Sequence, residues 1–120
     1  MIEIKLTPNQ NEAVYFMIGS PNFCEYNSQN FWDFREETES ERKRYIKEFD
    51  SISHDNEKMI LKFIPYEAVR NEMIYDLERF REIALDGLSY GSSPADKKAD
   101  RELHGLRRSV SILINKIKKL

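Results

Sequence analysis

The groups best suited to bind an anion gather where a short loop meets a predicted helix, in residues 90–101. Ser93 is a typical helix N-cap, Pro94 suits the first helical position, and free N–H groups at a helix N-terminus attract anions. Serine hydroxyls and basic side chains add donors, and Tyr90 could stack on a ring. We therefore consider a phosphate or nucleotide site here. Its candidate residues are Tyr90, Ser92, Ser93, Lys97 and Arg101, followed along the same helix by Arg107 and Arg108. The alternative is ordinary helix capping and solubility.

Combinations of residues typical of catalysis are nearly absent from the chain. The histidines are His54 and His104, and the lone Cys24 is far in sequence from both and lies in no nucleophile motif. Asp100 and His104 are four residues apart on a predicted helix and could share a metal, but two ligands without a third favour a hydrogen bond on the helix surface instead. No phosphate-binding or dinucleotide-binding glycine pattern occurs. We expect no catalytic residue, metal or cofactor, and rather a protein that is not an enzyme.

Large apolar side chains outside the predicted core stripes are the candidates for contact with another protein. Ile74 and Ile112 each lie off the apolar stripe of their own helix. Phe31 and Trp32 belong to a segment, 23–34, in which aromatic rings alternate with polar amides. Such a segment describes either a recognition surface or a cap on one end of the helices.

Two long helices, 66–86 and 94–119, are the strongest structural prediction, since apolar residues recur at helical spacing in both. The short loop between them favours an antiparallel hairpin. Gly87 is expected to end the first helix in a left-handed conformation. Gly105 lies inside the second helix, where we expect it to mark either the close approach of a neighbour or a mild kink. We expect Arg107, at the border of the second apolar stripe, to extend into solvent or pair with an acid of the first helix.

The N-terminal half contains two clear strand patterns and one ambiguous segment. Residues 2–7 alternate apolar and polar side chains, and 58–64 read as a largely buried strand. Between them, 7–10 form a capping-box pattern that would start a helix through residue 18, but 8–11 also suit a turn and 14–18 are rich in strand formers. We favour a strand over 12–18. A third helix is predicted over 37–52, followed by a polar break at 51–56.

These elements predict an α+β fold in a single domain, 1–120. A small antiparallel sheet of about three strands (2–7, 12–18 and 58–64) would pack against three helices, with the long helical hairpin at the C-terminus. The chain is long enough to bury a core without disulfides or metal.

Composition and charge narrow the possible settings and partners. A single cysteine fits a reducing compartment, no signal peptide is visible in residues 1–8, and the longest apolar run, 13–18, is too short to span a bilayer, so we predict a cytoplasmic protein. Residues 95–120 carry eight basic and three acidic groups, a net +5, whereas 1–94 carry eleven basic and eighteen acidic groups, a net −7. This asymmetry indicates either an anionic partner or a basic helix lying on an acidic body.

Three functions are consistent with this sequence. The first is a small non-catalytic binding or inhibitory protein that acts through protein contacts or self-association; in size and composition it is similar to immunity proteins, antitoxins and phage counter-defence proteins. The second is a protein that binds a small molecule, a nucleotide or other phosphate, at residues 90–101. The third is nucleic-acid binding through the basic last helix, which the acidic remainder of the chain would oppose.

Overall fold

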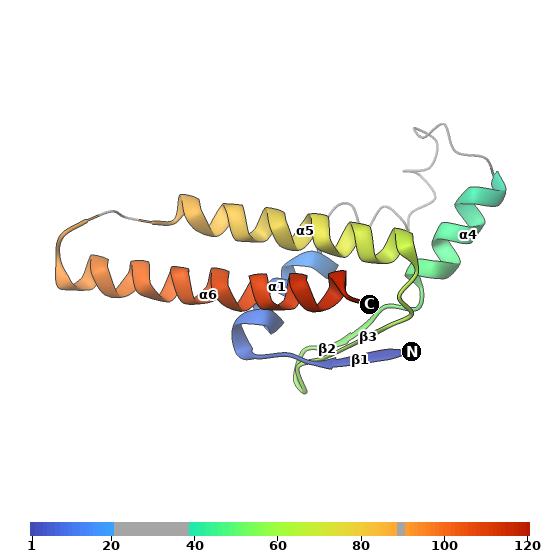
Figure 1. The fold of residues 1–120 in the computed structure, drawn as a ribbon, viewed down its shortest axis with the longest axis horizontal. Helices are drawn as coiled ribbons and strands as arrows, with labels where there is room; N and C mark the ends of the chain where they lie inside the picture. The colour runs from blue at the N-terminus through green and yellow to red at the C-terminus, as the bar shows by residue number, and fades with distance from the viewer. Residues whose placement is uncertain (21–38, 89–90) are drawn as a thin grey trace.

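The computed structural model describes residues 1–20, 39–88 and 91–120. Its longest feature is an antiparallel pair of helices, α5 (Glu67–Asp86) and α6 (Pro94–Lys118), as the sequence predicted (Figure 1). The Ser93 hydroxyl accepts a hydrogen bond from the Asp96 N–H at 3.1 Å, and Pro94 occupies the first turn, so α6 begins where its capping residues predict. The apolar stripes of the two helices face one another and continue into the core.

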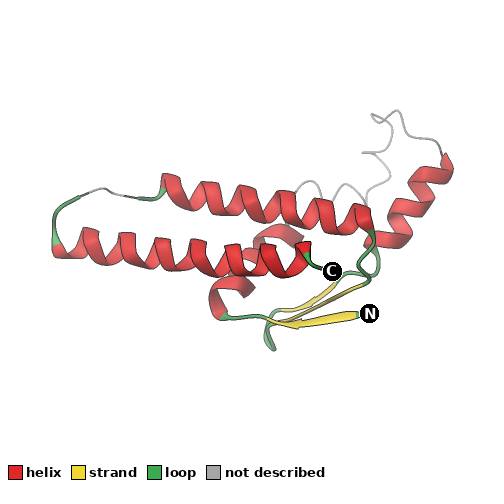
Figure 2. Cartoon of the chain, viewed as in Figure 1, coloured by secondary structure: helices red, strands yellow, loops and turns green. Residues whose placement is uncertain are grey.

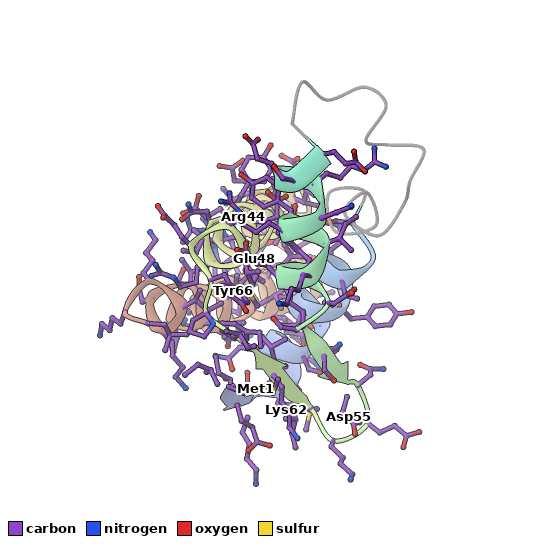
Figure 3. The ribbon with its side chains drawn as sticks, turned by 90° about the vertical axis from the view of Figure 1, so that its right-hand side faces the viewer. Met1, Arg44, Glu48, Asp55, Lys62 and Tyr66 are labelled. Carbon is purple, nitrogen blue, oxygen red and sulfur yellow. The ribbon has the colours of Figure 1, made fainter. Side chains whose placement is uncertain are left out.

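A three-stranded antiparallel sheet lies at one end of the hairpin (Figure 2). It contains β1 (Ile2–Lys5), β2 (Ser53–Asp55) and β3 (Ile60–Phe63) in the order β1-β3-β2. Alternate residues point to opposite faces of a strand, so Ile4, Leu61 and Phe63 are buried while Lys62 lies outside. In the end-on view of Figure 3, Lys62 and Asp55 lie at the outer side of the sheet, below the helices.

The strand prediction for 12–18 is wrong, because these residues belong to helix α1 (Pro8–Ile18). Its capping box is complete: the Thr7 hydroxyl accepts from the Gln10 N–H at 3.3 Å, and the Gln10 carbonyl oxygen Oε1 accepts from the Thr7 N–H at 3.0 Å. Helical geometry also explains burial, since Met17 is fully buried while Tyr15 is 65 % exposed. In a strand these two side chains would share a face.

The third strand of the sheet is β2, which lies in a segment predicted to be a polar break. Ser53 and Asp55 are exposed and His54 is only half-buried, so no apolar pattern marks the strand. It exists because its backbone pairs with β3, with His54 opposite Leu61 and Asp55 opposite Ile60. The helix predicted over 37–52 is α4 (Glu39–Phe49), in which Phe49 is buried.

The domain has two layers, with the α5–α6 hairpin in one and α1 with the sheet in the other. Three contacts hold α1 and the residues after it against the hairpin. Near the start of α1, the Gln10 Nε2 donates to the Ser109 carbonyl at 3.0 Å. Near its end the Phe16 and Phe80 rings lie 5.2 Å apart, and beyond it the Ser20 hydroxyl donates to the buried Asp76 carboxylate at 3.1 Å. The core lies between the layers. The fully buried side chains include Val14, Met17, Leu61, Phe63, Val69, Met73, Leu77, Val110, Leu113, Ile114 and Ile117. No helix of the described residues is long and apolar enough to cross a membrane.

Gly87 does not adopt its predicted conformation, and one of the two expectations for Gly105 is not met. Gly87 ends α5 with φ −82° and ψ −5°, so the expected left-handed conformation is absent. A Cβ at Gly87 would lie 3.3 Å from the Leu103 Cδ1, which shows that α6 approaches the chain closely there. At Gly105, where a close approach was one expectation, a Cβ would meet only the Arg108 guanidinium at 4.0 Å.

Replacing Gly105 by alanine is expected to stabilise the protein by about 0.5–1 kcal/mol, because the helix interior has room for the methyl group and alanine has the better helix propensity. Chemical denaturation followed by circular dichroism measures the change. Gly87→Ala is the matched control, since its methyl group would crowd Leu103 and should give no comparable gain. A destabilised Gly105→Ala protein would contradict this reading of α6.

A polar cluster joins β2 to α1 around His54. The His54 Nε2 lies 2.7 Å from the Asn11 Oδ1, and the Asn11 Nδ2 donates to the Asn56 Oδ1 at 2.9 Å. Burial lowers the pKa of His54 below its ordinary value of 6.5, and the neighbouring Asp55 carboxylate opposes part of that change.

Stability is therefore expected to fall as the pH falls below about 6.5, since the unfolded chain then binds a proton at residue 54 that the folded chain binds less well. The contribution is complete above pH 6.5 and is lost as the pH falls through the lower folded pKa. Unfolding free energies measured between about pH 5 and 7.5 should show a smaller slope in His54→Gln than in the unmodified protein. A replacement of His104, which lies on an exposed surface, is the control. Equal slopes in His54→Gln and the unmodified protein would contradict the assignment.

Candidate functional site: a basic groove on the helical hairpin

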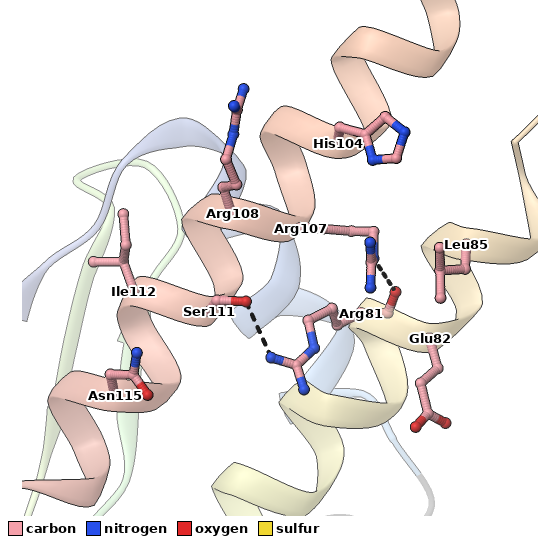
Figure 4. Close-up of a pocket in the computed structure, with 9 residues that line it drawn as sticks. All are labelled: Arg81, Glu82, Leu85, His104, Arg107, Arg108, Ser111, Ile112 and Asn115. Atoms are coloured by element: carbon pink, nitrogen blue, oxygen red, sulfur yellow. Dashed lines mark hydrogen bonds between the residues drawn. The ribbon is translucent and has the colours of Figure 1, made fainter.

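The hairpin has a second face, opposite α1, that no other element covers within the described residues; we call it the open face (Figure 4). Two adjoining hollows run along it, one of about 780 Å³ between α5 and α6 and one of about 520 Å³ nearer the start of α6. His104 lines both, so we treat them as one basic groove. Its lining is Arg81, Glu82, Leu85, Ser92, Pro94, Lys97, Asp100, Arg101, His104, Arg107, Arg108, Ser111, Ile112 and Asn115.

The α6 side of the groove is a single ridge of side chains. Its members follow one another at intervals of three or four residues, the spacing that places side chains on one face of a helix. The ridge consists of Lys97, Arg101, His104, Arg108, Ile112 and Asn115. The opposite side of α6 faces α1 and the core, so the ridge points outward as a consequence of the same periodicity that buries the apolar stripe.

Two arginines connect the walls of the groove. The Arg107 Nε donates to the Arg81 backbone carbonyl at 3.3 Å, and the Arg81 Nη1 donates to the Ser111 hydroxyl at 3.0 Å (Figure 4). Arg107 thus bonds a carbonyl of α5, where an acidic side chain was one expectation. Each guanidinium uses one N–H in these bonds, of the five that an arginine side chain carries.

The groove is positively charged. Arg81, Lys97, Arg101, Arg107 and Arg108 line it, against two carboxylates, and none of the five lies within 4.0 Å of an acidic group among residues 1–20, 39–88 and 91–120. Ion pairs do occur elsewhere in the hairpin, such as the Lys118 Nζ with the Glu78 Oε1 at 3.6 Å. The excess charge of the groove is therefore available to a ligand.

The predicted anion site at 90–101 is partly assembled. Ser92, Lys97 and Arg101 line the same hollow. Ser93 does not line it, because its hydroxyl accepts the Asp96 N–H as a cap. The Asp96 carboxylate itself packs closely against Gly91, so an acidic group already stands at the start of α6. Tyr90 lies outside the described residues.

The predicted protein-contact residues differ in exposure and in whether the structure describes them. Ile112 is 60 % exposed and lines the groove, whereas Ile74 is partly buried against the core, which leaves less of it for a partner. Phe31 and Trp32 lie outside the described residues, as does Cys24.

Metal binding receives no support from the part of the chain that the structure describes, which contains no group of three or more potential ligands. Asp100 and His104 line the same hollow, but without a third ligand.

The α5 wall and the polar members of the groove were missed in the sequence. Glu82 read there as ordinary surface, and Arg81, Leu85, Ser111 and Asn115 were not singled out. A readable signal existed for α6, since residues 97–115 repeat at intervals of three and four along one face. No comparable signal identifies the α5 side, which depends on how the two helices are rotated about their axes.

Comparison with protein-family models, curated protein sequences and solved structures found no match for this chain. The case for a function therefore depends on the groove itself.

Proposed function

We propose that this chain is a small non-catalytic binding protein that docks a partner protein on the open face of its helical hairpin. The observation that carries the proposal is an exposed isoleucine, Ile112, set among cations that have no acidic partner in the described part of the chain. An exposed apolar group that shares a groove with arginines is typical of protein interfaces, where arginine is enriched and often contributes strongly to affinity. A large exposed apolar side chain in a groove also gains from being covered.

The test is site-specific crosslinking in a lysate of the source organism. A photo-reactive benzophenone residue at Asn115, in the groove, should yield one protein adduct of defined mass, and the same residue at Tyr15 should not, because Tyr15 is exposed on α1, on the opposite face of the hairpin. Ile112→Asp should abolish the adduct with the melting temperature nearly unchanged, since the side chain is mostly exposed. Absence of an adduct, or the same adducts from both positions, would refute the proposal.

A phosphate-bearing small molecule is the second candidate, supported by the hollow that Ser92, Lys97 and Arg101 share. It ranks lower because Asp96 stands at the helix N-terminus and Asp100 lines the same hollow, and both would repel a phosphate. ATP and inorganic phosphate should raise the melting temperature if the site binds them, and Arg101→Ala should remove the shift. No shift with either ligand excludes this candidate.

A further inference from the structure

We propose that the element docked in the basic groove is an acidic amphipathic helix, which lies along α6 as a third helix on the open face. The inference rests on the proposed function and names the chemistry of its partner. The ridge from Lys97 to Asn115 spans roughly 27 Å at the rise of an α-helix. That length matches a partner helix of about 18 residues.

The order of side chains along the groove explains why the partner should be amphipathic. Ile112 is exposed near one end, and Leu85 contributes a half-buried apolar surface from α5. Arg101 and Arg108 are exposed along the outer edge, with Arg81 on the opposite wall. A helix with an apolar stripe flanked by carboxylates would cover the first pair and neutralise the cations on both sides.

The hairpin already receives one helix in this manner. On the opposite face α1 packs against both α5 and α6, burying Ala13, Val14 and Met17. Two adjacent helices form a groove that accepts the side chains of a third by ridge-into-groove packing. The open face presents the same pair of helices with cations where the α1 face has apolar residues, so a partner helix needs acidic flanks.

The lining favours an acidic protein over a nucleic acid. Glu82 and Asp100 lie among the cations and would oppose a backbone that carries a charge at every phosphate, whereas the carboxylates of a helix can be spaced to avoid them. No Phe, Tyr or Trp side chain for base stacking is among the described residues that line the groove. The whole chain also carries a net charge of −2, whereas nucleic-acid-binding domains are usually strongly basic.

The experiment uses synthetic peptides and the full chain. One dye-labelled helical peptide of about 18 residues has a leucine stripe flanked by glutamates, and its matched control has lysine in place of each glutamate. Fluorescence anisotropy should show binding of the glutamate peptide, weakening with added salt, and much weaker binding of the lysine peptide.

Two charge-matched variants locate the contact. Arg101→Glu with Arg108→Glu reverses two groove cations, and should weaken binding of the glutamate peptide by about tenfold or more. Lys5→Glu with Lys47→Glu makes the same change of net charge on β1 and α4, away from the groove, and should leave affinity within about threefold. All four side chains are exposed, and melting temperatures verify that both variants fold. The lysine peptide should recover binding to the groove variant.

Several results would overturn the inference. They are equal binding of the two peptides, equal weakening by the two variants, or tighter binding of a DNA or RNA oligonucleotide than of the glutamate peptide. If any of these occurs while the Asn115 adduct persists, only the acidic helix is refuted. If the adduct is absent while the glutamate peptide binds as described, the proposed function fails and the groove's preference for an acidic helix stands.

Discussion

Replacing Met17 by alanine is expected to lower the free energy of unfolding by about 2–5 kcal/mol, because its side chain is fully buried between α1 and the hairpin and its removal leaves a cavity. Chemical denaturation monitored by circular dichroism measures the loss. Tyr15→Ala, two residues away on the exposed side of the same helix, should change the free energy by no more than about 0.5 kcal/mol.

This pair of variants separates the helix from the strand that residues 12–18 could have formed. In a strand, Tyr15 and Met17 would lie on one face and respond alike, whereas in α1 they lie on different sides. Equal effects of the two substitutions would contradict the helix. Where Met17→Ala proves too unstable to measure, Met17→Leu keeps most of the volume and should cost less than about 1.5 kcal/mol.

Replacing Gln10 by alanine is expected to destabilise the protein by about 1–3 kcal/mol, since this buried amide makes two hydrogen bonds of different kinds. Its Oε1 accepts the Thr7 N–H in the capping box, and its Nε2 donates to the Ser109 carbonyl on α6. The substitution removes both bonds and leaves the Thr7 N–H without this acceptor.

Gln10→Glu isolates the second bond. Glutamate suits the capping box as well as glutamine, so the bond to the Thr7 N–H is retained, but the carboxylate cannot donate to the Ser109 carbonyl and would repel it. Gln10→Glu should therefore be less stable than the unmodified protein at neutral pH in thermal and chemical denaturation. If it is equally stable, the tertiary bond contributes nothing. Thr7→Ala is expected to lower the free energy of unfolding by about 1 kcal/mol, and it measures the contribution of the Thr7 cap alone.

Local signals were sufficient for the helical hairpin. The predicted helices 66–86 and 94–119 correspond to α5 and α6 within one residue at each end. Both have a long apolar repeat, and Ser93 with Pro94 determines the start of α6. Such signals depend on side chains a few residues apart, which is why they can be read from sequence.

Segments whose state depends on distant contacts were not predictable in the same way. For residues 12–18, the capping box favoured a helix, whereas the strand-forming residues favoured a sheet. The segment is a helix because this conformation buries Val14 and Met17 against the hairpin. The polar β2 is a strand only because β3 lies beside it.

The groove combines both kinds of information. The chain by itself determined that Lys97, Arg101, Arg108 and Ile112 share one face of α6, because a fixed 3.6-residue period relates them. Tertiary structure alone decided that Arg81 and Leu85 of α5 form the facing wall, and that α1 covers the other side of the hairpin and leaves this one open. The physical reason is that the number of residues per helical turn is a property of the backbone. The rotation of one helix about its axis relative to another is set by packing among residues distant in sequence.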